Sequence, residues 1–162
     1  SIIEQVAARL PEDGALIEFV RFTPYNFQPG EGRRAWETPR YLALVLLPAR
    51  NIEVADLGAG ESIEQLAAQL LRGVSNPRNA YQQAAFELHL RLIAPLAEYL
   101  KGRRSPFISA DGIVNLVPLA ALHDGEHFLL DTFDALTYLS SGRDLLPRQP
   151  ATALGPVAVF AD

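Results

Sequence analysis

The sequence predicts a domain of mixed α/β character, in which antiparallel strands and hairpins accompany two central helices and lead into the start of a parallel sheet. Three observations predict this class. Apolar runs of strand length flank a central region with helical periodicity, at residues 62–100. Asp-Gly pairs, which accept the backbone angles of tight turns, separate later apolar runs. Residues 157–160 are apolar at every position, which is typical of a central strand in a parallel sheet.

The composition fits one domain and excludes several classes of function. The chain has 162 residues, of which 49% are hydrophobic, enough for a real core. A formal charge of −5 argues against nucleic acid as a dominant partner. The absence of cysteine excludes disulfides and thiolate metal sites. No long apolar run predicts a membrane span and no signal peptide is recognisable, so we expect a cytoplasmic protein.

The first 40 residues predict a helix, a strand and a long loop. Ile2, Val6 and Leu10 have helical spacing up to Pro11, and this helix over residues 1–10 is either a short element or the tail of an upstream helical region. Residues 15–22 predict a strand. The loop at residues 23–39 contains Trp36, and we interpret it as a hairpin connection whose aromatic residues cover a sheet edge, with a partner-binding loop as the alternative.

The middle of the chain predicts a hairpin followed by two helices. Residues 41–47 and 52–57 form the expected antiparallel pair. Ser62 and Gln65 fit a capping box for a helix that ends at Gly73. A longer helix is expected over residues 80–100, with apolar residues on two faces and a kink at Pro95. The apolar residues that define these helices are Ile63, Leu66, Ala67, Leu70 and Leu71 in the first, Leu88, Leu92, Leu96 and Tyr99 on one face of the second, and Phe86, Leu90, Ile93 and Ala97 on its other face.

The last third of the chain predicts short strands joined by turns. The expected strands are residues 106–109, 113–122, 127–130 and 134–139, with Asp-Gly turns at Asp111 and Asp124. Ser140 and Ser141, with an acid at Asp144, predict a capped helix start. A linker at residues 147–155 then precedes the apolar run. We expect residues 156–162 to be the first strand of a core that this chain does not complete, and the lack of methionine after Ser1 also suggests an internal or processed piece.

Three patterns with the residue types of active sites have simpler structural explanations. The Gly58 to Gly60 turn is similar to turns of nucleotide and S-adenosylmethionine sites, but it follows a predicted hairpin and lacks the further glycine and acid of such sites. His123 and His127 flank a turn without any known metal-ligand spacing, and His89 is expected at a polar helical position. No serine lies in a nucleophile elbow. The sequence therefore predicts no catalytic residue, cofactor site or metal site.

Two side chains are the candidates for contacts with a substrate or partner. Arg143 follows a strand at a helix start, where it either braces the turn through Asp144 or Asp134 or orients an acid of a partner. We favour the bracing role. Trp36, the single tryptophan, is the other candidate because of its position in the long loop.

A set of short motifs lies in order along the chain: Leu10-Pro11, Leu16-Ile17-Glu18-Phe19-Val20, Pro39-Arg40-Tyr41-Leu42-Ala43, Asp56-Leu57-Gly58, Asp111-Gly112, Val114, Leu116-Val117-Pro118, Ala121-Leu122, Phe128-Leu129 and Tyr138-Leu139-Ser140-Ser141-Gly142-Arg143-Asp144-Leu145. Together these motifs resemble the CHAT family, caspase-like domains often joined to tetratricopeptide repeats. Ala110 stands where the family usually has proline. The family's catalytic His and Cys lie C-terminal to all of these motifs, and this chain has no cysteine.

The resemblance implies that the chain is the N-terminal structural portion of a caspase-like cysteine peptidase domain, without its catalytic dyad. The implied partners are the C-terminal catalytic portion, upstream helical repeats, and a protein or peptide substrate of the whole protein. One alternative is a non-enzymatic scaffold or interaction module related to CHAT domains. The other is a nucleotide- or S-adenosylmethionine-binding domain that uses Gly58 and Gly60.

Overall fold

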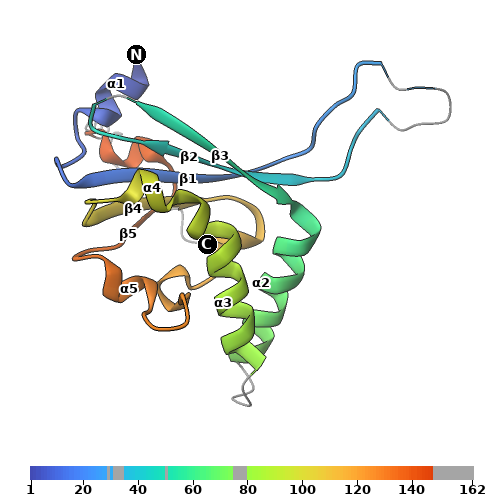
Figure 1. The fold of residues 1–162 in the computed structure, drawn as a ribbon. Coiled ribbons are helices and arrows are strands. Elements are labelled where there is room, and N and C mark those ends of the chain that lie inside the picture. The colour runs from blue at the N-terminus through green and yellow to red at the C-terminus, as the bar shows by residue number, and fades with distance from the viewer. Residues whose placement is uncertain (29, 31–34, 50, 75–79, 148–162) are drawn as a thin grey trace, which may run out of the picture.

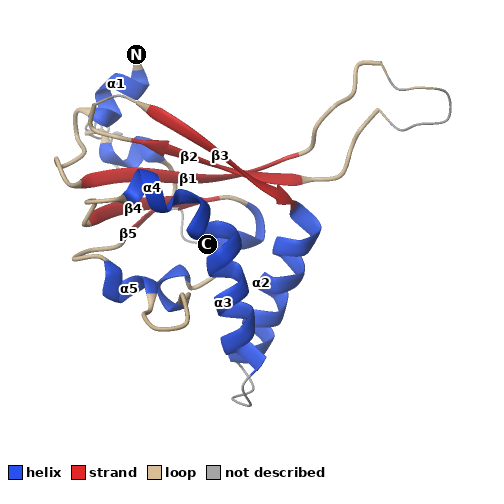
Figure 2. Ribbon diagram, viewed as in Figure 1, coloured by secondary structure: helices blue, strands red, loops and turns tan. Residues whose placement is uncertain are grey.

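A five-stranded mixed sheet forms the centre of the molecule in the computed structural model, which describes residues 1–28, 30, 35–49, 51–74 and 80–147. The strands are β1 (Gly14–Phe22), β2 (Arg40–Leu46), β3 (Ile52–Ala59), β4 (Ser105–Ala110) and β5 (Thr137–Leu139), in the spatial order β3-β2-β1-β4-β5. The β1, β2 and β3 strands are antiparallel neighbours, whereas β1, β4 and β5 run parallel (Figure 2). The predicted mixed α/β class is therefore confirmed.

Two helices cover one face of the sheet. They are α2 (Gly60–Val74) and α3 (Ala80–Leu92), which pack side by side below the sheet in Figure 1. Alternate β1 residues such as Ile17 and Phe19 point into this layer, together with Ala43 and Val45 of β2. The α2 stripe predicted from sequence supplies the facing residues, and Ile63, Ala67 and Leu70 are almost fully buried. The alternation along the strands and the helical period thus build a single core.

The opposite face of the sheet has a smaller cover. It consists of α1 (Ile2–Ala7) and the 3₁₀ turn η4 (Gly142–Leu145). Val6 and Ala7 of α1 pack on Leu16 and Leu46 of the sheet, while Phe107, Leu139, Leu145 and Leu146 lie around them. The α1 helix begins with a capping box in which Ser1 accepts from the Glu4 amide.

Pro95 divides the predicted long helix as expected. The α3 helix ends at Leu92, a 3₁₀ turn, η1, follows at Ala94–Leu96, and α4 continues at Ala97–Leu100. One predicted apolar face is well buried, since Leu88, Leu92 and Leu96 are inaccessible to solvent. The other face is only partly buried: Ile93 lies in the core, whereas Leu90 is 49% exposed and Ala97 is also exposed. The prediction of two packed faces is therefore wrong for Leu90 and Ala97.

The helix predicted to begin at a Ser62 cap starts earlier than expected, and its predicted cap is wrong. The α2 helix begins at Gly60, directly after β3, and the Ser62 hydroxyl donates to the Ala59 carbonyl at 3.1 Å instead of capping Gln65. Gln65 donates to the Glu61 carboxylate. Gly73 lies inside the helix, where a side chain would collide with Tyr81 of α3, so this glycine permits close packing of the two helices.

Two of the predicted strands after β4 are helical turns. Residues predicted as a strand at 113–122 form η2 (Gly112–Leu116) and η3 (Leu119–Ala121), and the predicted strand at 127–130 overlaps α5 (Leu129–Thr132). Pro118 cannot donate to a sheet ladder, and the carboxylate of Asp111 accepts from the Gly112 amide to start η2 instead of a hairpin. Buried Val114, Leu119 and Leu122 explain why the apolar run exists without a strand.

The Asp124 turn, the β5 strand and the η4 cap are confirmed, although β5 is shorter than predicted. An isolated bridge joins His123 to Phe128 across the Asp124-Gly125 turn. The β5 strand spans three residues of the six predicted. The predicted central strand at residues 156–162, and most of the linker before it, lie outside the described residues.

Candidate functional site: a contact surface beside Arg143

A tight turn from Ser140 to Leu145 follows the edge strand β5 and carries Arg143. Asp144 accepts from the Ser140 and Ser141 amides at 2.9 and 3.1 Å, and Ser141 accepts from the Arg143 amide at 3.3 Å. This reciprocal arrangement is the capping box that the sequence predicts. It fixes the backbone on both sides of Arg143.

Contacts to β1 and β4 hold this turn on the sheet. The Gly142 amide donates to Glu18 Oε1 of β1 at 2.9 Å, and the Ser109 hydroxyl of β4 donates to the Ser140 carbonyl at 3.2 Å. A Cβ atom on Gly142 would lie 2.5 Å from the Leu16 side chain, so a larger residue would require Leu16 to move. Glu18 and Ser109 are positioning residues that sequence analysis did not identify, since no local pattern links either residue to the distant turn that it contacts.

Arg143 itself is exposed and does not brace the turn through an acid. Asp144 is occupied by backbone amides, and Asp134 forms an ion pair with Arg104 on another surface. Within the part of the chain that the structure describes, Arg143 forms no ion pair. The favoured bracing role is therefore not supported by either predicted partner, and the partner-contact role of Arg143 stays a prediction.

Apolar side chains surround Arg143 on this face of the sheet. Two adjoining hollows of about 180 and 120 Å³ share Ile3, Leu16, Glu18 and Leu46, and Arg143 lines the larger one. Ile2, Ile3, Ile52 and Val54 around them are between 43% and 58% exposed. We call the surface formed by Ile2, Ile3, Leu44, Ile52, Val54 and Arg143 the open face. Its combination of apolar area with one cation and a partly buried carboxylate suits contact with protein.

The loop that contains Trp36 projects from the body of the molecule (Figure 1). An isolated bridge joins Tyr25 to Trp36, and the Asn26 amide donates to the Ala35 carbonyl at 2.7 Å, so its base is a hairpin extension as predicted. Its aromatic residues contact one another rather than a sheet edge: the Tyr25 ring lies 5.0 Å from Phe27 and 4.9 Å from Trp36. Phe27 is 87% and Trp36 62% exposed. The expected edge cover is thus wrong, and a partner contact by Trp36 stays a prediction.

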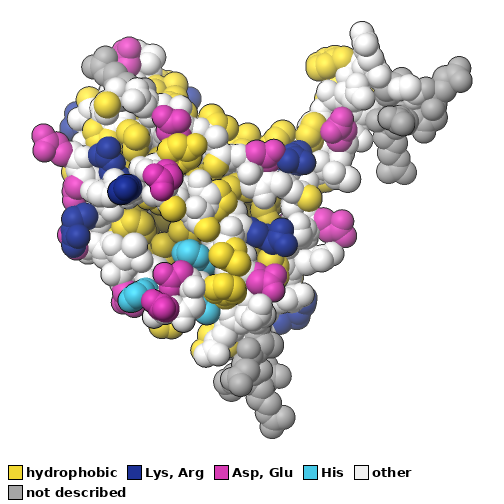
Figure 3. Space-filling view, viewed as in Figure 1, with side chains coloured by type: hydrophobic (Ala, Val, Ile, Leu, Met, Phe, Trp, Pro, Cys, Tyr) yellow, Lys and Arg dark blue, Asp and Glu magenta, His cyan; other side chains and the backbone are white. Residues whose placement is uncertain are grey.

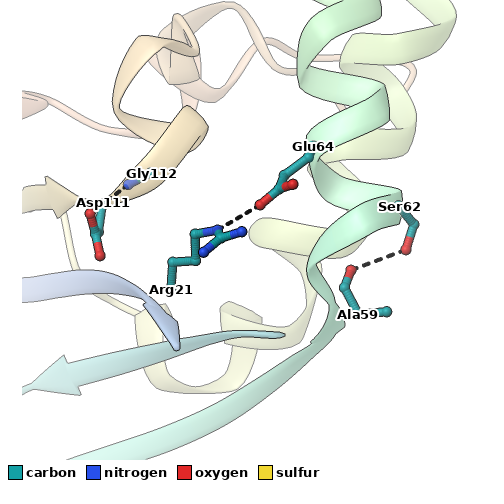
Figure 4. A network of polar contacts seen from close by, with 6 residues as sticks. All are labelled: Arg21, Ala59, Ser62, Glu64, Asp111 and Gly112. Atoms are coloured by element: carbon teal, nitrogen blue, oxygen red, sulfur yellow. Dashed lines mark hydrogen bonds and ion pairs between the residues drawn. The ribbon is translucent and has the colours of Figure 1, made fainter. Parts of the chain in front are cut away.

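A polar network at the junction of the sheet with α2 is drawn in Figure 4. Arg21 of β1 donates to Glu64 of α2 at 2.7 Å, and Asp111 and Gly112 lie on the neighbouring turn (Figure 4). Tyr41 is fully buried beside them, and burial raises the pKa of its hydroxyl, with the Glu64 charge acting in the same direction. The hydrogen bond to Glu64 likewise raises the pKa of Arg21. This network ties α2 to the sheet.

The amides of the Gly58–Gly60 turn and the His123 ring have internal partners. The Gly58 amide donates to Asp56 and the Gly60 amide to the Pro39 carbonyl at 2.8 Å, so these amides are not free for a phosphate or cofactor. His123 Nε2 bonds to the Gln82 carbonyl at 3.0 Å. His89 is half-buried rather than exposed, and burial lowers the pKa of its imidazole. Among the described residues no group of His, Asp and Glu has the arrangement of a metal site.

The fold and these contacts define a class: a mixed α/β domain with one covered and one open sheet face, and with no cysteine to serve as a thiolate nucleophile. A family model described as CHAT domain matches residues 82–161. Residues 82–161 are therefore similar to the CHAT domain family, and the family resemblance is confirmed over that part of the chain.

No curated protein matches the chain at significant similarity. Among the described residues, no helix is long and apolar enough to cross a membrane.

Proposed function

We propose that this chain is the N-terminal supporting portion of a CHAT-like, caspase-like cysteine peptidase domain. In this proposal the chain contributes no catalytic residue. The peptidase dyad, a His that activates a Cys thiolate for attack on a peptide carbonyl, lies in a C-terminal portion of the same domain. The match to the CHAT family supports the assignment, and the absence of cysteine agrees with a non-catalytic role.

The observation that carries the proposal is the unequal cover of the sheet. One face is buried under α2 and α3, and its residues reach 0–2% exposure at Ala15, Ile17 and Phe19. On the other face α1 and η4 cover only the end near Leu16, and Val54 is 58% exposed. Exposed apolar area of this kind favours contact with further polypeptide, because burial of apolar surface is the main gain in protein association.

The parallel strands of the sheet also support the proposal that this chain is part of a larger α/β domain. The β4 and β5 strands extend β1 in parallel, and parallel sheets occur almost only with helices over both faces. The C-terminal portion would therefore pack on the open face and meet Arg143. An arginine there suits an acidic side chain of that portion or of a bound peptide.

A peptidase assay tests the proposal directly. The 162-residue chain should cleave no panel peptide, whereas the intact parent protein should cleave one or more and lose that activity on thiol alkylation. Turnover by the 162-residue chain alone, or an intact parent whose hydrolysis is insensitive to alkylation, would contradict it.

A scaffold or interaction module related to CHAT domains is the second candidate. The projecting loop favours it (Figure 1), because its Phe27 and Trp36 expose aromatic area, and aromatic residues often dominate protein interfaces. The parent sequence distinguishes the two candidates. A strand ending in His-Gly and a later strand ending in Cys would support the peptidase, and their absence would support the scaffold.

A further inference from the structure

A groove away from the open face has the features of a small-ligand site. It lies between the end of the α3–α4 segment and α5, and its volume is about 390 Å³, within the range of small-molecule pockets. Ile93 and Leu100 form one apolar wall, and Leu129 and Phe133 of the α5 region form the other. The space-filling view shows a hollow with a hydrophobic floor on this side of the molecule (Figure 3).

Two cations line the groove without an acidic partner. Within the described part of the chain, neither Lys101 nor Arg103 forms an ion pair, whereas the neighbouring Arg104 is held by Asp134. One carboxylate, Asp124, also lines the groove. It accepts from the Glu126 and His127 amides at 2.8 and 2.7 Å, so it is already engaged by its own turn.

Arg103 has an unused donor. Its Nη1 donates to the Glu12 carbonyl at 2.6 Å, which fixes the guanidinium in place, but its Nε is buried and has no hydrogen-bond partner. A buried donor without an acceptor is unfavourable, so an acceptor supplied from the groove would satisfy it. Guanidinium groups also bind carboxylates through two parallel hydrogen bonds.

We propose that this groove binds a small monocarboxylic acid with an apolar body, with the carboxylate on Arg103 and Lys101 and the body between the α4 and α5 walls. The apolar walls explain why a free inorganic anion would fit poorly, and the paired cations explain why a neutral apolar molecule would bind more weakly. The assignment is independent of the peptidase proposal, because the groove lies on the α3–α5 side of the sheet.

Hexanoate is a suitable probe, with 1-hexanol as its neutral counterpart. In ¹H–¹⁵N NMR spectra of the 162-residue chain, hexanoate should give saturable shifts at the Gly102 and Arg103 amides. Its dissociation constant should be at least about tenfold lower than that of 1-hexanol. Equal binding of the two, or no saturable shift with hexanoate, would overturn the proposal.

Variants separate the charge from the cavity. Arg103→Gln should weaken hexanoate binding by at least about tenfold, while Arg72→Gln, which removes one exposed cation from the last turn of α2, should leave it unchanged. Ala97→Phe places a large side chain at an exposed position in the groove wall and should also abolish binding. Thermal melts establish that each variant folds. Undiminished binding in either groove variant would refute the site, and if Arg103→Gln does not fold, Ala97→Phe decides.

Discussion

Both the backbone conformation and the packing at position 112 favour glycine over a residue with a side chain. The φ of 60° at Gly112 lies in the left-handed region, and a Cβ there would collide with the buried Tyr41 hydroxyl. Gly112→Ala should therefore destabilise the chain by about 1–3 kcal/mol. Urea unfolding measures this. Gly102→Ala, with a similar φ of 76° but open space around it, is the matched control and should cost less.

His89 should make stability depend on pH near neutrality. Burial lowers the pKa of its imidazole below 6.5 in the folded chain, with Asp124 opposing and His123 reinforcing the shift. Between the lowered pKa and 6.5 the unfolded chain binds more protons, so the free energy of unfolding falls as pH drops below about 7.

The contribution of His89 can be isolated by substitution. His89→Gln should flatten the decrease in stability between about pH 7 and pH 5, measured by urea unfolding at each pH. His127→Gln is the control, since this exposed side chain lies 3.9 Å from Asp124 and outside the buried layer. An unchanged slope in His89→Gln would contradict the assignment.

Asp134 should contribute stability that disappears in acid. Its hydrogen bond from Arg104, whose Nε lies 2.5 Å from Oδ2, lowers the pKa of the carboxyl below 3.8. This contribution to the free energy of unfolding is present above the carboxyl pKa of the unfolded chain. It is lost as the pH falls through the lower pKa of the folded chain. Both side chains are mostly exposed, so the effect is small and decreases with salt. Asp134→Asn should remove it from unfolding curves recorded between about pH 2 and pH 5.

At the level of elements, two leucines of the α3 helix lie on different predicted apolar faces and differ in burial. Leu88 is fully buried and Leu90 is 49% exposed, although both are leucines on the same helix. Leu88→Ala should cost about 2–5 kcal/mol, whereas Leu90→Ala should cost about 0.5 kcal/mol or less. Comparable losses in denaturant unfolding would show that α3 packs on both sides.

Sequence periodicity predicted the elements that have one buried face and failed where tertiary contacts determine conformation. The β1–β3 meander, α2, and the break at Pro95 follow from alternation, helical spacing and proline chemistry. The η2 and η3 turns were predicted as a strand because their apolar residues are closely spaced. The packing of η2 on α2 and of η3 on α5, together with the proline at position 118, favours 3₁₀ turns instead.

The candidate site was less accessible to sequence analysis than the fold. The η4 capping box and the exposed position of Trp36 in a long loop have local signatures. The anchoring of Gly142 by Glu18 joins residues 124 positions apart, and the groove at Arg103 brings together α4 and α5. Such contacts depend on strand order, which a single sequence does not specify.

At the scale of the whole molecule, the account depends on the open face being an internal surface of a larger domain. The chain has no cysteine, so Val54→Cys introduces a single labelling site at a side chain that is 58% exposed. Maleimide labelling of the 162-residue variant should be rapid and close to its rate in denaturant. The substitution lies at an exposed position and should leave the fold of the chain intact.

The decisive measurement is the labelling rate of the same Val54→Cys site in the intact parent protein, followed by peptide mass spectrometry so that other cysteines do not interfere. The account predicts strong protection relative to the 162-residue chain, because the C-terminal portion of the domain covers the open face. Equal labelling rates in the two proteins would contradict it.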